Sequence, residues 1–131
     1  MIAVDTSALV AIVLGEPDAE RYLARLGRHP CRLSTVSFVE AMMVVEARQG
    51  ADASRDLELL VDAAIDTVVP VDVDIARAAV AGWRRFGRGR HTAALNFGDC
   101  FSYAVASLAG IPLLYKGDDF AQTDIAAVII D

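Results

Sequence analysis

Residues 95–106 read LNFGDCFSYAVA, and this stretch decides how the rest of the chain is interpreted. Beyond Gly98, apolar side chains recur at the i, i+3, i+4, i+7 spacing of a helix, namely at Phe101, Ala104, Val105 and Leu108. Small alanines occupy other faces, so we expect a helix buried on most sides. Asp99 then lies in the first turn of an interior helix. It is interpreted either as a helix cap or as one of several converging carboxylates.

The composition indicates one folded domain spanning residues 1–131. Hydrophobic residues make up 55% and charged residues 23% of the chain, which excludes a disordered protein. The net charge of −6 excludes an indiscriminate nucleic-acid binder. The charge is uneven, however, because five arginines and no acid lie between Ile75 and Gly98.

Two features favour a cytoplasmic protein that does not enter a membrane. The N-terminus lacks a basic segment and Asp5 interrupts its apolar run, which fits neither a signal peptide nor a membrane span. Cys31 and Cys100 lack metal-ligand spacing and are expected to be free thiols.

Strands and helices are expected to alternate along the chain. Short apolar runs predict strands at 1–4, 31–34, 67–71 and 112–115, with a further edge strand at 127–130. Helical patterns cover 8–14, 18–26, 36–47, 57–64, 74–86 and the stretch after Gly98. On the helix at 74–86, Trp83 and Phe86 are expected on the core face. This order predicts the α/β class, with a mostly parallel central sheet flanked by helices.

Acidic residues stand where such a sheet places its functional site. Asp5 ends the first strand, and Asp118 and Asp119 follow a later one. Polar residues just past the carboxyl ends of parallel strands meet at one edge, which Asp99 should also face.

Glu40 has two interpretations. Ser37-Phe38-Val39-Glu40 matches a capping box, in which the glutamate side chain accepts a hydrogen bond from the serine N–H. However, apolar residues flank Glu40 on the predicted helix, and a carboxylate among them needs a partner.

Several carboxylates in one pocket repel each other unless a cation lies among them. All-oxygen ligands favour Mg²⁺, with Mn²⁺ as a substitute, over zinc. Because protein-bound Mg²⁺ commonly also binds substrate phosphate, the pattern points to phosphoryl chemistry.

Four blocks together resemble the PIN-domain ribonucleases, and within that family the VapC toxins of toxin–antitoxin pairs. The blocks occur in the family's order and span nearly the whole chain: Val4-Asp5-Thr6-Ser7-Ala8-Leu9, Ser34 to Glu40, Leu95 to Tyr103, and Lys116-Gly117-Asp118-Asp119-Phe120.

The resemblance implies a metal-dependent endoribonuclease with Asp5, Glu40 and Asp99 in its acidic site. The family places a fourth acid before an aromatic residue, which favours Asp119, although Asp118 could serve. Thr6 or Ser7 would orient a metal-bound water. Hydrolysis would leave a 5′-phosphate and a 3′-hydroxyl. The resemblance also implies a homodimer and a VapB-type antitoxin that covers the acidic pocket.

The arginine-rich window has a functional and a structural interpretation. It is either a solvated helix end or an RNA phosphate-binding surface formed by Arg84, Arg85, Arg88 and Arg90. His91 beside it is interpreted as an RNA contact rather than a general base.

Two other functions are weighed against the nuclease. A phosphoacceptor receiver domain also combines an α/β sheet, acids and Mg²⁺, but Asp5 is unpaired and Val69-Pro70-Val71-Asp72 is a poor acceptor site. A PIN fold used only as a protein-binding module would be expected to lose the acids, and here all are present.

Overall fold

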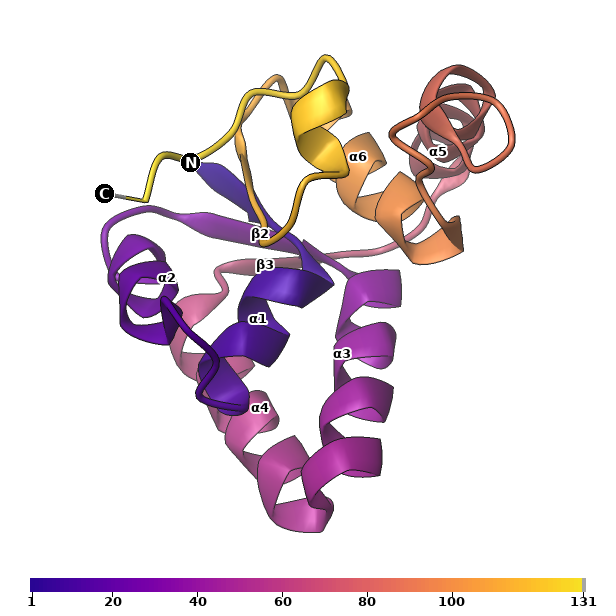
Figure 1. Cartoon of the computed structure of the whole chain (residues 1–131). Coiled ribbons are helices and arrows are strands. Elements are labelled where there is room, and N and C mark those ends of the chain that lie inside the picture. The colour runs from indigo at the N-terminus through magenta and orange to yellow at the C-terminus, as the bar shows by residue number, and fades with distance from the viewer. Residues whose placement is uncertain (131) are drawn as a thin grey trace.

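The short apolar runs form a parallel four-stranded sheet in the computed structural model, which describes residues 1–130 (Figure 1). The sheet order is β3-β2-β1-β4. Every pairing in it is parallel, as predicted. The bounds are β1 Ile2–Val4, β2 Cys31–Ser34, β3 Thr67–Val69 and β4 Leu113–Leu114.

Six α-helices and one 3₁₀ turn connect and cover the strands. Their bounds are α1 Thr6–Val13, α2 Ala19–Leu26, α3 Thr35–Gln49, α4 Ala51–Ala64, α5 Val73–Phe86, α6 Phe97–Ala109 and η1 Phe120–Gln122. Figure 1 shows α1–α4 on one side of the sheet and α5 and α6 on the other. Within residues 1–130, no helix is long and apolar enough to cross a membrane.

The sheet separates two hydrophobic cores. Because successive side chains of a strand point to opposite faces, Val4 packs with Leu9 and Leu33 while its neighbour Ala3 packs with residues of α5 and α6. β1 lies between β2 and β4 and is buried on both faces. The carboxyl end of β1 is therefore held by neighbouring strands on both edges and by packing on both faces. Asp5 follows it directly, and the Asp5 N–H donates to the Leu114 carbonyl at 2.9 Å.

Several predicted elements have different bounds in the structure; α4, for example, begins at Ala51 rather than at 57, and β3 ends at Val69 rather than at 71. α3 begins at Thr35 rather than at 36, because Ser34 is its N-cap and accepts a hydrogen bond from the Val36 N–H at 3.1 Å. Ser37 is thus already helical, and the capping box with Glu40 does not form. The expected strand at 127–130 is reduced to a single bridge between Leu113 and Ala127.

The buried face of α5 is also rotated from the prediction. Ile75, Ala79, Gly82 and Phe86 are buried, but Trp83 is 43% exposed. The cause is the close approach of α6: a Cβ atom on Gly82 would lie 2.5 Å from Cδ1 of the buried Tyr103 ring. Gly82 therefore faces α6, and Trp83, one position further along, turns toward solvent. Leu108 of α6, expected on the apolar face, is 54% exposed.

We expect Gly82→Ala to destabilise the fold by about 1–2 kcal/mol in urea unfolding. The added methyl group overpacks the Tyr103 contact at a cost of ~1–3 kcal/mol, of which better helix propensity offsets up to ~1 kcal/mol. Gly27→Ala is the control, since a Cβ there meets its nearest atom at 3.6 Å and Gly27 has a φ of −73°. Equal stability of the Gly82→Ala and Gly27→Ala proteins would contradict this packing of α5 on α6.

Candidate functional site

Asp5 is a buried carboxylate held by three hydrogen bonds. It is the N-cap of α1, and the whole residue is only 3% exposed. Oδ2 accepts from the Ser7 N–H at 3.0 Å and from Ser7 Oγ at 2.6 Å, while Oδ1 accepts from Ser102 Oγ at 2.5 Å. These donors replace lost water and fix the orientation of the carboxylate.

A chain of buried hydroxyls connects Asp5 to two other helices. Ser102 of α6 lies 3.0 Å, Oγ to Oγ, from Ser37 of α3, and both residues are at most 1% exposed. Thr6 Oγ1 donates to the Ser37 carbonyl at 3.3 Å. The hydroxyls of Thr6 and Ser7, predicted to orient water, thus both have protein partners, and their predicted role stays a prediction. Ser37 and Ser102 were not predicted as site residues; the signal that could have found them is a small polar residue on an otherwise apolar helix face.

Asp99 takes part in the capping box of α6, whose N-cap residue is Asn96, and it also belongs to the acidic group. The Asp99 N–H donates to Asn96 Oδ1 at 2.8 Å, and the Asn96 N–H donates to Asp99 Oδ2 at 3.0 Å, forming a capping box. The two interpretations of Asp99 are therefore compatible, because this box engages Oδ2 alone.

The pKa of Asp99 is influenced by burial and by the charges of nearby acids. The pKa of Asp99 is raised from 3.8 to about 7, mainly by burial and in smaller part by the charges of Asp5, Asp119 and Glu40, against the lowering effect of the Asn96 N–H. Asp118 is not among these influences; it contributes instead, after burial, to the raised pKa of Tyr115. The arrangement favours Asp119 over Asp118 as the fourth acid.

Three of the predicted acids line one cleft of about 310 Å³, at the carboxyl ends of β1 and β4. Asp5, Glu40 and Asp99 share it with Thr6, Ser7 and Asn96, and Asp119 lies outside its lining. Glu40 reaches the cleft because the second residue of α6 is a glycine: a Cβ atom on Gly98 would lie 2.5 Å from Glu40 Oε2 and 2.7 Å from Oε1. Gly98, like Ser37 and Ser102, is a site residue that the sequence pattern did not indicate.

The donor set of the cleft fits a hard divalent cation. Its acidic ligands are all oxygens, and neither histidine nor cysteine lines it. Among residues 1–130, no three His, Cys, Asp or Glu side chains are placed closely enough to hold an ion as they stand. Burial, with a smaller contribution from the charges of Asp5, Asp119 and Glu40, nevertheless raises the pKa of Asp99, and a bound Mg²⁺ or Mn²⁺ would favour its ionised form.

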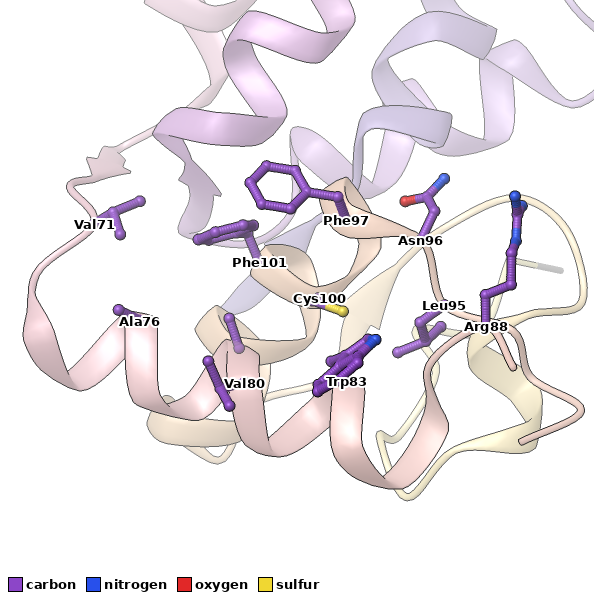
Figure 2. A pocket seen from close by; sticks show the side chains of 11 residues that line it. Val71, Ala76, Val80, Trp83, Arg88, Leu95, Asn96, Phe97, Cys100 and Phe101 are labelled. Carbon is purple, nitrogen blue, oxygen red and sulfur yellow. The ribbon is translucent and has the colours of Figure 1, made fainter. Parts of the chain in front are cut away.

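The predicted arginines lie in the last turn of α5 and in the segment that follows it, and they have different environments. Arg85 pairs with Asp124 at 3.0 Å, and the Arg90 guanidinium lies 4.2 Å above the Trp83 ring. Arg88 lines an apolar cavity of about 550 Å³ with Trp83 and Asn96 (Figure 2). Because Asn96 lines both this cavity and the acidic cleft, the arginine segment adjoins the acids. Arg84 is exposed.

Comparison with known proteins gives a consistent result. The PIN domain family model matches residues 2–126. Ribonuclease VapC30 of Mycobacterium tuberculosis is 49% identical over 130 residues, which cover 98% of this chain and 99% of that protein. Ribonuclease VapC of Mycolicibacterium smegmatis is 49% identical over 128 residues, covering 97% and 99%.

Solved structures share the fold at lower sequence identity. Mycobacterium tuberculosis VapC20, described as a sarcin–ricin loop cleaving toxin, superposes with a TM-score of 0.79 at 20% identity, and 98% of each chain is covered. A toxin–antitoxin complex from Klebsiella pneumoniae superposes with a TM-score of 0.71 at 19% identity, covering 98% and 97%.

We expect the acidic cleft to impose a pH dependence on the metal-free protein. Between pH ~4 and ~7 the folded state binds more protons at Asp99 than the unfolded state does, so the free energy of unfolding falls as pH rises through this window. Asp99→Asn should flatten that fall and melt at or above the wild type at pH ~8 in chelator. Melting curves across pH check this.

The same variant tests the metal. Mn²⁺ should raise the wild-type melting temperature, because a ligand that binds only the folded state stabilises it by about 2.7 kcal/mol at ~100 times its Kd. Asp99→Asn should lose most of this response, whereas Asp62→Asn, on the exposed face of α4, should keep it. An equal Mn²⁺ response of all three proteins would show that Asp99 does not help to hold the ion.

Proposed function

The chain belongs to the PIN domain family and, within it, to the VapC ribonucleases. On this premise we propose that it hydrolyses RNA with divalent metal ions, which are held by Asp5, Glu40, Asp99 and Asp119. The observation that carries the proposal is the shared cleft, where acids from β1–α1, α3 and the start of α6 converge. The hydrogen bonds to Asp5 and Asp99 support it, because they set each carboxylate before any ion binds.

The chemistry is an in-line displacement at phosphorus. A bound Mg²⁺ or Mn²⁺ would supply a water of lowered pKa and would neutralise the phosphate. Water oxygen bonds to phosphorus, the bond from phosphorus to the 3′ oxygen breaks, and that oxygen takes a proton, leaving 5′-phosphate and 3′-hydroxyl ends. The contribution of this chain is positional: Ser7 and Ser102 hold Asp5, Asn96 holds Asp99, and Gly98 leaves room for Glu40.

The partners are an RNA substrate, a VapB-type antitoxin and a second copy of the chain. A toxin–antitoxin complex among the proteins of this fold supports an antitoxin partner, and we propose that it covers the acidic cleft. Beside the cleft, Val39, Met43 and Phe97 are 54%, 68% and 76% exposed and line one groove. Such a contiguous apolar patch supports a homodimer surface. We expect the protein to act in the cytoplasm, where RNA is abundant.

Of the two other functions considered, the match to the PIN domain family speaks against a receiver-like domain. A PIN fold used only to bind protein is distinguished by the cleavage assay below.

Purified protein with Mn²⁺ should cleave single-stranded RNA, and sequencing of the fragments should find 5′-phosphate ends. Asp5→Asn should abolish cleavage. Ser102→Ala should reduce it by roughly 10–100-fold, the usual effect of losing a group that positions a metal ligand. Asp62→Asn is the folded control. Undiminished cleavage by the Asp5→Asn protein would remove Asp5 from the site, and no cleavage by the wild type would favour the binding module.

The arginines should differ in their effect on RNA affinity. Because Arg88 adjoins the cleft, Arg88→Ala should reduce the slope of log affinity against log salt by about 0.7, the loss of one phosphate contact to a single strand. Arg85→Ala should change the slope less, since Asp124 already neutralises that guanidinium. Fluorescence anisotropy with labelled RNA over a salt series measures both slopes. An unchanged slope for Arg88→Ala would favour the interpretation of this segment as a solvated helix end.

A further inference from the structure

Two cations and one carboxylate stand at the mouth of the acidic cleft and take no part in the proposed metal site. Lys116 follows β4, Arg48 lies in the last turn of α3, and Glu16 lies in the loop between α1 and α2. All three line the cleft that contains Asp5 and Asp99. Glu16 Oε1 lies 3.0 Å from Lys116 Nζ, and Glu16 Oε2 lies 3.6 Å from Arg48 Nη1.

The pairing of these cations is unexpected in a cleft of acids. Lys116 and Arg48 are the cations of its lining, yet their recorded ion pairs are with Glu16 and not with Asp5, Glu40 or Asp99. The Glu16 carboxylate gives one oxygen to each cation. A phosphodiester has the same feature, two anionic oxygens on one centre, and Lys and Arg are its usual ligands.

We propose that Lys116 and Arg48 bind a backbone phosphate of the RNA, next to the phosphate that is hydrolysed, and that Glu16 occupies this position when RNA is absent. The proposal rests on the ribonuclease function proposed above and adds a substrate-binding site to it. Glu16 is then an internal competitor of the substrate.

The position of Lys116 is fixed relative to the acids. Its backbone N–H donates to Ser7 Oγ at 2.9 Å, and Ser7 Oγ donates to Asp5 Oδ2 at 2.6 Å. One hydroxyl therefore connects the backbone of the phosphate-binding residue to a proposed metal ligand. A strand bound at Lys116 would enter the cleft beside Asp5.

Exchange of Glu16 for a phosphate requires only a side-chain movement. The side chains of Lys116 and Arg48 are 37% and 60% exposed, and exposed ion pairs contribute little to stability. The Glu16 backbone stays anchored through its N–H, which donates to the Ala11 carbonyl at 2.9 Å. The carboxylate can thus rotate away while the loop keeps its conformation.

A double-mutant cycle in RNA binding tests the proposal. The Asp99→Asn protein serves as the background, since it should leave RNA intact, and a short labelled single-stranded RNA is the probe. Lys116→Gln should raise the Kd about threefold to tenfold and reduce the salt slope by about 0.7. Glu16→Gln should lower the Kd about twofold to fivefold, as expected for removing one competing exposed ion pair.

The decisive comparison is Glu16→Gln in a protein that also carries Lys116→Gln and Arg48→Gln. There the gain in affinity should disappear, because Glu16 acts through those cations. Asp52→Asn and Arg55→Gln, which break a matched exposed ion pair on α4, are the controls and should leave the Kd unchanged. Melting temperatures of all variants verify folding.

Two results would overturn the proposal. One is an equal gain from Glu16→Gln with and without the two cations, and the other is an equal gain from Asp52→Asn; either shows a general effect of net charge. The two proposals fail separately. If the protein cleaves RNA but the mutant cycle is additive, only the phosphate-site proposal is rejected. If the cycle is non-additive but the protein does not cleave RNA, only the nuclease proposal is rejected.

Discussion

The burial of the Asp5 carboxylate constrains the rest of the structure. Asp5 lies at the end of the central strand, where its backbone completes the pairing with β4 and its side chain begins α1. The carboxylate is tolerated there because hydroxyls from α1 and α6 donate to it. Ser37 of α3 extends this network by one further hydroxyl. Helices from both sides of the sheet thus meet at one anion.

The negative charges of Asp5 and Asp99 in the cleft are stabilised in different ways. Asp5 is satisfied by donors of the protein itself, so its orientation does not depend on a ligand. Asp99 has a capping contact, yet burial and neighbouring acids raise its pKa to about 7. A proton can satisfy Asp99 in the free protein, and a cation can replace that proton. This imbalance is the kind of local destabilisation that functional sites retain.

Local patterns predicted the elements, and the contacts between elements account for what was missed. The strand at 31–34 was confirmed, and Asp5 follows β1 at its carboxyl end as expected, because alternation and turn residues are encoded over a few neighbouring residues. The start of α3 was misplaced because Ser34 and Ser37 are equally good caps in isolation.

Contacts between residues that are far apart in the chain could not be predicted from local sequence patterns. Ser102 and Asp5 are 97 positions apart, and Lys116 and Glu16 are 100 apart. No periodicity connects residues at such separations. The orientation of Trp83 similarly depends on how closely the Tyr103 ring approaches α5.

Gly98 has a genetic consequence. Any amino-acid replacement of this glycine adds a Cβ atom, and that atom would occupy the space of the Glu40 carboxylate. Because the carboxylate is the end of a flexible side chain, it can move aside at little cost to the fold. Given the metal-binding role proposed for Glu40, a single missense mutation in the Gly98 codon is expected to inactivate the nuclease while leaving a folded protein. A cell that loses its antitoxin can escape by such a mutation and still keep the gene.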